Sequence, residues 1–254
     1  MNASAAAGTV VYAIGDIHGR FDLLQALMAG IEADAARRPA RHRQLVCLGD
    51  YVSRGADSRR VVETLIAAPP PGFTRITLRG NHEDLWLRFL DGDLDAGRHW
   101  FDYDGLDTLA DYGVAITDRS RRDDATVAAL RDAFDALLPS AHRGFLRSTE
   151  AGHRCGDYFF AHAGVRPGVP LDRQAARDLM WIRSPFLEST LDHGAVVVHG
   201  HSIAESPQLR PNRIGIDTGC LLYTSDAAAE RSSVDLRGCR IIQKKKENTD
   251  VKGG

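Results

Sequence analysis

The chain has 254 residues, a formal net charge of −2 and an isoelectric point near 6.5. This length suffices for one large domain with its own core, and the near-neutral charge excludes a general affinity for polyanions. No apolar run is long enough to span a bilayer, and the four cysteines lack CxxC spacing. We therefore expect a soluble, cytoplasmic protein without nucleic-acid or membrane partners.

Short apolar runs alternate with amphipathic helical patterns in the N-terminal third of the chain. The predicted strands cover residues 9–14, 44–48 and 74–78, and the predicted helices cover 20–34, about 58–68 and the segment from about Glu83. This alternation predicts an α/β fold with a parallel sheet and right-handed crossovers.

The composition of the chain changes after this alternating part. Residues 91–143 are acidic and polar with two helical patterns, which predicts a small helical cap inserted into the α/β body. From residue 144 onward short strands are predicted in GFLRST, DYFFAHAG, AVVVHGHS and RIGIDTG. One domain over residues 1–219, carrying a cap at 91–143, is the simplest organisation.

Five of the predicted strands end in segments that combine glycine with potential metal ligands. These segments are GDIHG, GD, GNHE, HAG and HGHS, and they supply Asp16, His18, Asp50, Asn81, His162 and His201. The carboxyl ends of strands in an open α/β sheet form the rim where ligands bind, so we expect these side chains to converge. His199 alternates to the other face of its strand and is interpreted as a structural histidine.

The mixture of oxygen donors and imidazoles favours manganese, with iron or zinc as alternatives, over calcium. A shared carboxylate can bridge two ions about 3.5–4 Å apart, as in hydrolytic two-metal sites. The sequence therefore predicts two divalent metal ions that polarise a phosphoryl oxygen and activate a water.

The series GDIHG, GDYVSRG, GNHE, HAGV and GHS resembles the calcineurin-like metallophosphoesterases, most closely the bacterial and phage members of the phosphoprotein phosphatase superfamily. The resemblance covers about residues 9–219. It implies a four-layer αββα sandwich that hydrolyses phosphate esters. The implied metal ligands are Asp16, His18, Asp50, Asn81, His162 and His201, with Asp50 bridging both ions.

The resemblance also implies catalytic and substrate-binding roles. His82 would protonate the leaving alkoxide, and Asp50, as the bridge, would be catalytic with it. Arg54 would clamp the phosphate, which suits a planar guanidinium, and Asn81 would lie beside the substrate. Arg183 in MWIRSPF is the candidate for a second clamp, with stacking on a neighbouring tryptophan as its alternative.

One position departs from the pattern of this family. The usual second motif reads GDxVDRG, and Ser53 stands where the family has an aspartate that pairs with the catalytic histidine. Without that carboxylate we expect a lower pKa for His82 and a rate reduced by about 10²-fold, with binding better preserved than turnover. Asp57 or Glu83 is an alternative source of the charge.

Three functions follow from these residues. The main prediction is a phosphomonoesterase that acts as a protein serine/threonine phosphatase, by in-line attack of a metal-bridged water. The alternatives are hydrolysis of dinucleoside polyphosphates such as diadenosine tetraphosphate, or metal and phosphate binding without catalysis. A protein phosphatase needs an open groove at the cap and a nucleotide hydrolase an enclosed base pocket.

The C-terminal residues 220–254 differ in composition from the rest. The lysines of the chain lie only at 244, 245, 246 and 252, and every other basic residue is an arginine that precedes them. The stretch CLLYTSDAAAERSSVDLRGCRII resembles translated sequencing-adapter DNA. We therefore expect the natural sequence to end near Gly219 or Cys220, with a divergent natural tail as the alternative.

Overall fold

The computed structural model describes residues 3–219, 229–236 and 239–246, which contain eight α-helices and two five-stranded sheets. The first sheet has the order β3 (Phe73–Thr77), β2 (His42–Cys47), β1 (Thr9–Ile14), β10 (Cys239–Lys246) and β9 (Ala229–Leu236). The second has the order β4 (Gly152–Cys155), β5 (Tyr158–Ala161), β6 (Val196–His199), β8 (Arg213–Gly215) and β7 (Gln208–Leu209).

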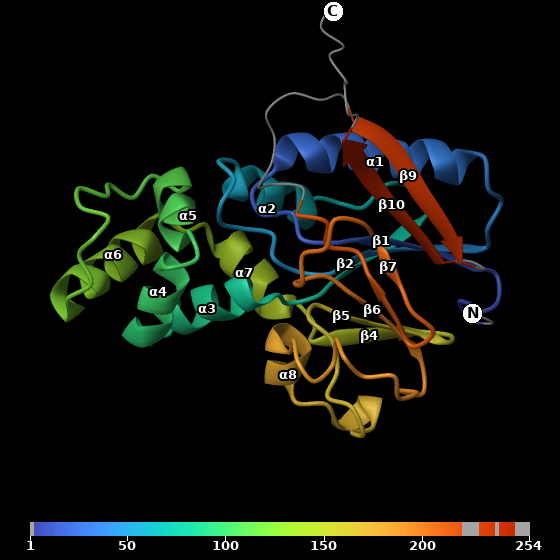
Figure 1. Ribbon diagram of the computed structural model, residues 1–254. Coiled ribbons are helices and arrows are strands. Elements are labelled where there is room, and N and C mark those ends of the chain that lie inside the picture. Colours follow the sequence, from blue (N-terminus) through green and yellow to red (C-terminus); the bar gives the residue numbers. More distant parts are fainter. Residues whose placement is uncertain (1–2, 220–228, 237–238, 247–254) are drawn as a thin grey trace, which may run out of the picture.

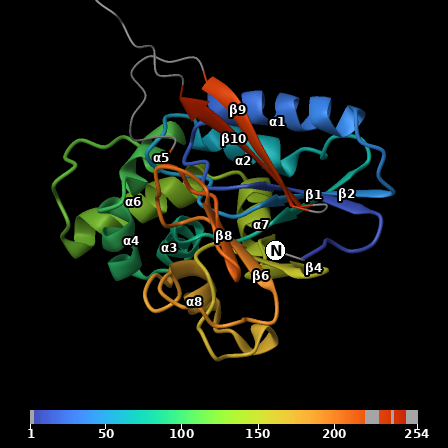
Figure 2. The ribbon, with the colours of Figure 1, turned by 45° about the vertical axis from the view of Figure 1, so that its right-hand side comes forward.

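The helices are α1 (Phe21–Ala36), α2 (Ser58–Ile66), α3 (Asn81–Leu90), α4 (Leu94–Phe101), α5 (Gly105–Asp111), α6 (Asp124–Leu137), α7 (Ser140–Ser148) and α8 (Ala176–Trp181). Figure 1 shows α1 above the first sheet, α8 on the opposite side of the molecule, and α4, α5 and α6 gathered at the left. Figure 2 shows the same separation of α1 from α8. No helix within the described residues is long and apolar enough to cross a membrane.

The core follows from the alternation of side chains along the strands. On β1, Tyr12 and Ile14 join a cluster with the helices, whereas Val11 and Ala13 join a second cluster with residues of β5, β6 and β8. Strand β1 therefore buries both of its faces, which explains its continuous run of apolar residues.

The α/β prediction is confirmed, and β1, β2 and β3 pair in parallel as expected. The predicted strand GFLRST is wrong, because residues Ser140–Ser148 form α7. The buried residues of this helix are His142 and Leu146, which lie one helical turn apart. An isolated apolar pair such as Phe145 and Leu146 has no period, so it does not distinguish a strand from a helix.

The segment expected to be a non-native tail contains two strands. β10 pairs in parallel with β1 and antiparallel with β9, and both views place this pair beside α1. The expected boundary after Gly219 is followed directly by residues 220–228, which lie outside the described residues, as do 237–238 and 247–254.

Candidate metal centre

The predicted ligands lie just beyond the carboxyl ends of strands from both sheets. Asp16 and His18 follow β1, Asp50 follows β2, Asn81 begins α3 after β3, His162 follows β5 and His201 follows β6. Parallel pairing aligns the ends of β1, β2 and β3 in one sheet and of β5 and β6 in the other. The two sets of side chains meet in one buried cluster.

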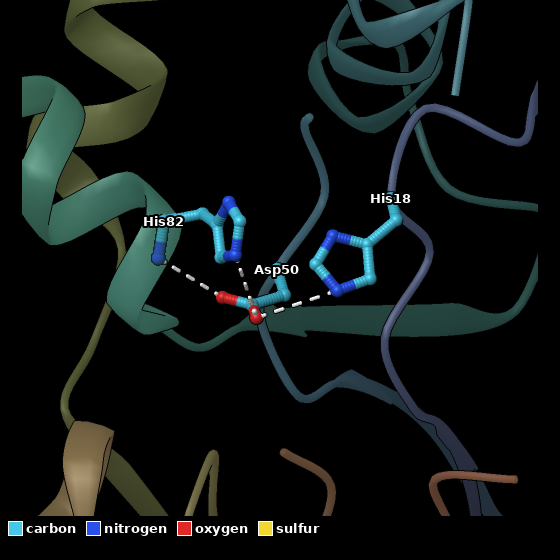
Figure 3. A group of neighbouring side chains, drawn as sticks. All are labelled: His18, Asp50 and His82. Atoms are coloured by element: carbon cyan, nitrogen blue, oxygen red, sulfur yellow. Dashed lines mark hydrogen bonds and ion pairs between the residues drawn. The ribbon is translucent and has the colours of Figure 1, made fainter. Parts of the chain in front are cut away.

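Asp50 lies between His18 and His82, as Figure 3 shows. Its Oδ2 is 3.6 Å from His18 Nε2 and 3.8 Å from His82 Nε2, and its Oδ1 is 3.5 Å from His162 Nε2. The donor atoms of His18, Asp50 and His82 lie within 4.8 Å of one another, and so do those of Asp50, His162 and His201. Asp50 belongs to both groups, which suits the expected bridge.

Asp16 and Asn81 lie against the same groups. Asp16 Oδ2 is 3.9 Å from His18 Nε2, and Asp16 Oδ1 accepts a hydrogen bond from the backbone N–H of His201 at 3.1 Å. Asn81 Oδ1 is 2.9 Å from His162 Nε2. The structure therefore brings all six predicted ligands together, and their assignment to individual ions stays a prediction.

Two of the histidines are oriented by backbone carbonyls. Nδ1 of His18 lies 3.0 Å from the Val52 oxygen, and Nδ1 of His162 lies 3.1 Å from the Leu48 oxygen. A carbonyl only accepts, so each Nδ1 carries the proton and each Nε2 directs its lone pair into the space beside the carboxylates, where a cation would be held. A metal-binding histidine is held in this way by its other nitrogen.

The charges of the cluster fit divalent cations. Burial raises the pKa of Asp16 well above its usual range, and the carboxylates of Asp217 and Asp50 raise it further. Burial, followed by the charge of Glu83, likewise raises the pKa of Asp50. Burial lowers the pKa of His18 to about 3, so this imidazole is neutral. Neutral imidazoles beside crowded carboxylates form a donor set that accommodates two divalent ions.

Backbone geometry gives the carboxylates their space. A Cβ on Gly80 would collide with Asp50 Oδ1, and a Cβ on Gly200 would collide with Asp16 Oδ1. The φ angles of His18 (47°), Asp50 (51°) and His201 (61°) lie in the left-handed region. Residues other than glycine adopt this conformation at an energetic cost, and such strain concentrates at functional sites.

Glu83 holds the two loops that carry Asp50 and Asn81. Its carboxylate accepts hydrogen bonds from the backbone N–H groups of Asp50 at 2.8 Å, Tyr51 at 2.8 Å and Gly80 at 3.0 Å. We expected Glu83 only as a substitute charge for His82. Its connecting role depends on contacts between distant segments that the GNHE motif alone does not show.

Among the described residues, one ring nitrogen of His82 has no hydrogen-bond partner. Nδ1 is buried without a hydrogen bond to any described residue, while Nε2 faces Asp50. Glu83 is engaged by backbone N–H groups, and Asp57 lies 3.4 Å from the Arg60 guanidinium. Neither acid makes the contact that we expected as an alternative to a carboxylate at position 53.

Ser53 instead connects the Arg54 loop to the neighbouring helices. The Trp100 indole Nε1 donates to Ser53 Oγ at 3.0 Å, and the Ser53 backbone N–H donates to Thr108 Oγ1 at 3.0 Å and Ser58 Oγ at 3.1 Å. Ser53 and Arg54 both have left-handed φ angles, 72° and 67°. These hydrogen bonds hold the loop in that conformation.

The cluster opens into a cavity of about 290 Å³. Its lining includes Asp16, His18, Asp50, Arg54, Asn81, His82, Tyr103, Trp181, Arg183, His201 and Ile203. Both predicted clamps, Arg54 and Arg183, therefore face the same space. Arg183 Nη1 donates to Ser202 Oγ at 3.2 Å, whereas the ring that stacks on Trp181 is that of His99.

Three residues near the site were not predicted. Tyr103 and Trp181 line the cavity, and no local motif marks them. Asp217 is 9% exposed and follows β8, and its carboxylate lies near enough to raise the pKa of Asp16. The segment GIDTG repeats the glycine–aspartate pattern of the other strand ends, so that pattern could have identified Asp217. His199, expected to be structural, packs edge-on against Phe186 at 5.1 Å.

Two proteins of known name are similar to this chain in sequence. Over 226 residues the chain is 26% identical to the asymmetrical bis(5'-nucleosyl)-tetraphosphatase PrpE of Anoxybacillus flavithermus, covering 82% of this chain and 84% of that protein. It is 31% identical over 167 residues to the symmetrical bis(5'-nucleosyl)-tetraphosphatase of Methylococcus capsulatus, covering 66% of this chain and 47% of that protein.

A solved structure has the same fold. The crystal structure of a putative diadenosine tetraphosphatase superposes with a TM-score of 0.61 at 20% identity, covering 94% of this chain and 98% of that one. The profile of the calcineurin-like phosphoesterase family matches residues 9–236. The predicted family is thus confirmed: the chain belongs to the calcineurin-like phosphoesterases and is a metal-dependent phosphoesterase.

Proposed function

We propose that this protein hydrolyses dinucleoside polyphosphates such as diadenosine tetraphosphate at a two-metal centre. The observation that carries the proposal is the sharing of Asp50 between two buried groups of side chains that could hold a metal ion, in a cavity that two arginines also line. The names of two relatives favour this substrate over the phosphoprotein that we expected first. Manganese is the proposed metal.

The reaction uses the side chains in distinct positions. The ions would be held by Asp16, His18, Asp50, Asn81, His162 and His201. At such a site two divalent ions supply Lewis-acid polarisation of a phosphoryl oxygen and a water of lowered pKa. Arg54 and Arg183 bind the remaining phosphate oxygens through paired N–H donors, beside Asn81. They orient the phosphorus for in-line attack.

His82 serves the leaving group. Its Nε2 reaches the cavity 3.8 Å from Asp50 Oδ2, and the protonated imidazole would give its proton to the departing phosphate oxygen and become neutral. Burial lowers the pKa of His82, so the protonated form is a small fraction at neutral pH. Because Nδ1 has no hydrogen-bond partner among the described residues, packing holds the ring, with the His18 ring edge-on at 4.8 Å. This support is weaker than a carboxylate pair.

We further propose the boundaries of the functional unit. Residues 1–219 form the metallophosphoesterase domain as an αββα sandwich, and residues 91–143 form its cap, which supplies Tyr103 to the cavity. All proposed ligands precede residue 202. Resequencing the source DNA tests whether residues 220–254 belong to the natural reading frame.

The proposal is tested with manganese and three substrates, namely p-nitrophenyl phosphate, a phosphoserine peptide and diadenosine tetraphosphate. We expect the highest kcat/KM for diadenosine tetraphosphate, and chromatography of the nucleotides identifies which phosphoanhydride bond is cleaved. An Asp50→Asn variant is the inactive control. Preference for the phosphopeptide would establish the protein phosphatase instead, and two bound metals without turnover would establish a binding protein.

A further inference from the structure

Beside the metal centre lies a line of aromatic rings that the proposed reaction does not use. It consists of Tyr103, in the loop between α4 and α5, His99 on α4, and Trp181 at the end of α8, and we call it the aromatic wall. Tyr103 is 41% exposed, although most large aromatic side chains of this fold are buried. Because Tyr103 also lines the cavity, its ring is accessible to a ligand bound there.

The rings of the aromatic wall support one another. His99 and Trp181 are stacked at 5.5 Å with an interplanar angle of 18°, and His99 lies 5.1 Å from the Tyr103 ring. Tyr103 in turn meets the His82 ring edge-on at 6.2 Å. The aromatic wall therefore runs from the region of Arg183 to the residue that protonates the leaving group.

The position of the aromatic wall defines a ligand with two parts. The phosphate belongs among Asp50, Arg54 and Arg183, and a planar group belongs against Tyr103. The His82 ring separates Tyr103 from Asp50, with Nε2 of His82 3.8 Å from the carboxylate and its ring 6.2 Å from Tyr103. A ligand that reaches both places needs a spacer alongside the His82 ring, and the ribose of a nucleotide is such a spacer.

We propose that the aromatic wall binds the base of the nucleotide that leaves from the metal centre, with Tyr103 as the specificity-determining residue. This inference rests on the proposed hydrolysis of dinucleoside polyphosphates. Every nucleobase presents a π-face, and stacking on an aromatic side chain contributes about 1–3 kcal/mol per base. A phosphoserine or phosphothreonine side chain has no ring to place there.

The test compares AMP with ribose 5-phosphate, which differ only in the adenine. Their Kd values are measured by isothermal titration calorimetry in the presence of Mn²⁺. We expect AMP to bind the wild-type protein about 5- to 150-fold more tightly, the equivalent of the stacking energy above. We expect Tyr103→Leu and Trp181→Leu to reduce this ratio towards one and Tyr103→Phe to preserve it.

The matched control is Ile203→Ala, because Ile203 lines the same cavity, is 49% exposed and has no ring. It should leave the ratio unchanged, and thermal unfolding confirms that each variant is folded. A wild-type ratio of one, or a ratio that both leucine variants leave unchanged, overturns the proposal. So does a Tyr103→Leu variant that loses affinity for phenyl phosphate but not for AMP, since the ring would then bind aryl esters.

The outcome separates this inference from the function on which it rests. If the protein prefers AMP but does not cleave diadenosine tetraphosphate, the proposed function fails and the aromatic wall stands as a nucleotide-binding surface. If it cleaves diadenosine tetraphosphate with an AMP ratio of one, the proposed function stands and the role of the aromatic wall is refuted.

Discussion

Replacing Glu83 by glutamine tests whether the metal centre depends on the acid that connects its two loops. Glu83 is fully buried, and Oε2 accepts from the backbone N–H groups of Asp50 and Gly80 while Oε1 accepts from Tyr51. A glutamine that keeps its oxygen in place of Oε2 points its NH₂ group at the Tyr51 N–H. The variant has nearly the same volume, so packing changes little.

The magnitude follows from these three hydrogen bonds. One donor is left unsatisfied in a buried position, which costs about 1–3 kcal/mol, and the two remaining bonds lose the charge of their acceptor. We therefore expect Glu83→Gln to lower the free energy of unfolding by about 2–4 kcal/mol. Because Asp50 loses a backbone support, Mn²⁺ affinity should fall by about 10- to 100-fold, as when outer partners of metal ligands are removed.

Urea unfolding with EDTA measures the stability without metal, and isothermal titration with Mn²⁺ measures the affinity. The control is Glu63→Gln, because Glu63 is half exposed and pairs with Arg59 on the surface of α2 at 3.0 Å. Exposed pairs of this kind contribute about 0–1 kcal/mol. If Glu83→Gln matches this control in both measurements, Glu83 does not position the site.

Four further predictions concern the site and its surroundings. Trp100→Phe leaves Ser53 Oγ without its buried donor, so thermal stability should fall by about 1–3 kcal/mol and KM should rise more than kcat falls, because the Arg54 loop loosens. Ser53→Asp should raise kcat near neutral pH, because a carboxylate at this position is expected to pair with His82. An unchanged or lower kcat would contradict that pairing. Burial lowers the pKa of His142 below 6.5, so protonation favours the unfolded chain. Stability should therefore decline as the pH falls through about 6.5, and less steeply in His142→Asn when unfolding is followed from pH 7.5 to 5. Finally, EDTA should lower the Tm of the wild type but not that of Asp50→Asn.

The strands and predicted ligands were accessible from sequence because they depend on local patterns. Residues 9–14 form β1 with the predicted bounds, and Asp16 and His18 follow where the apolar run stops. Parallel pairing then brings together the ends of β1, β2 and β3 in one sheet and of β5 and β6 in the other. That the two sets of ligands meet depends on how the two sheets pack, which local patterns do not show. α7 was missed because Phe145 and Leu146 are adjacent and show no helical period.

The supports of the site were not accessible in this way. The hydrogen bond from Trp100 to Ser53 joins two residues 47 positions apart in the chain. Tyr103 and Trp181 both pack against the ring of His99, and the sequence around each of them matches no binding motif. Such contacts depend on how the helices of residues 91–143 pack on the body, which local patterns do not determine.

Metal should raise the Tm because the folded protein has unfavourable backbone conformations and crowded carboxylates at the site. Left-handed backbone at His18, Asp50 and His201 costs about 1–3 kcal/mol each, and the neighbouring carboxylates of Asp16 and Asp50 repel one another in a buried position. Cations bound there remove the repulsion but leave the strain.

Asp50→Asn also removes the repulsion, by deleting one charge, and at the same time removes the bridging ligand. The metal-free variant should therefore be more stable than the metal-free wild type, while metal should stabilise only the wild type. A metal-free variant less stable than metal-free wild type would mean that the carboxylate charge strengthens the 3.1 Å hydrogen bond from the His82 backbone N–H to Asp50 Oδ1 by more than the repulsion costs.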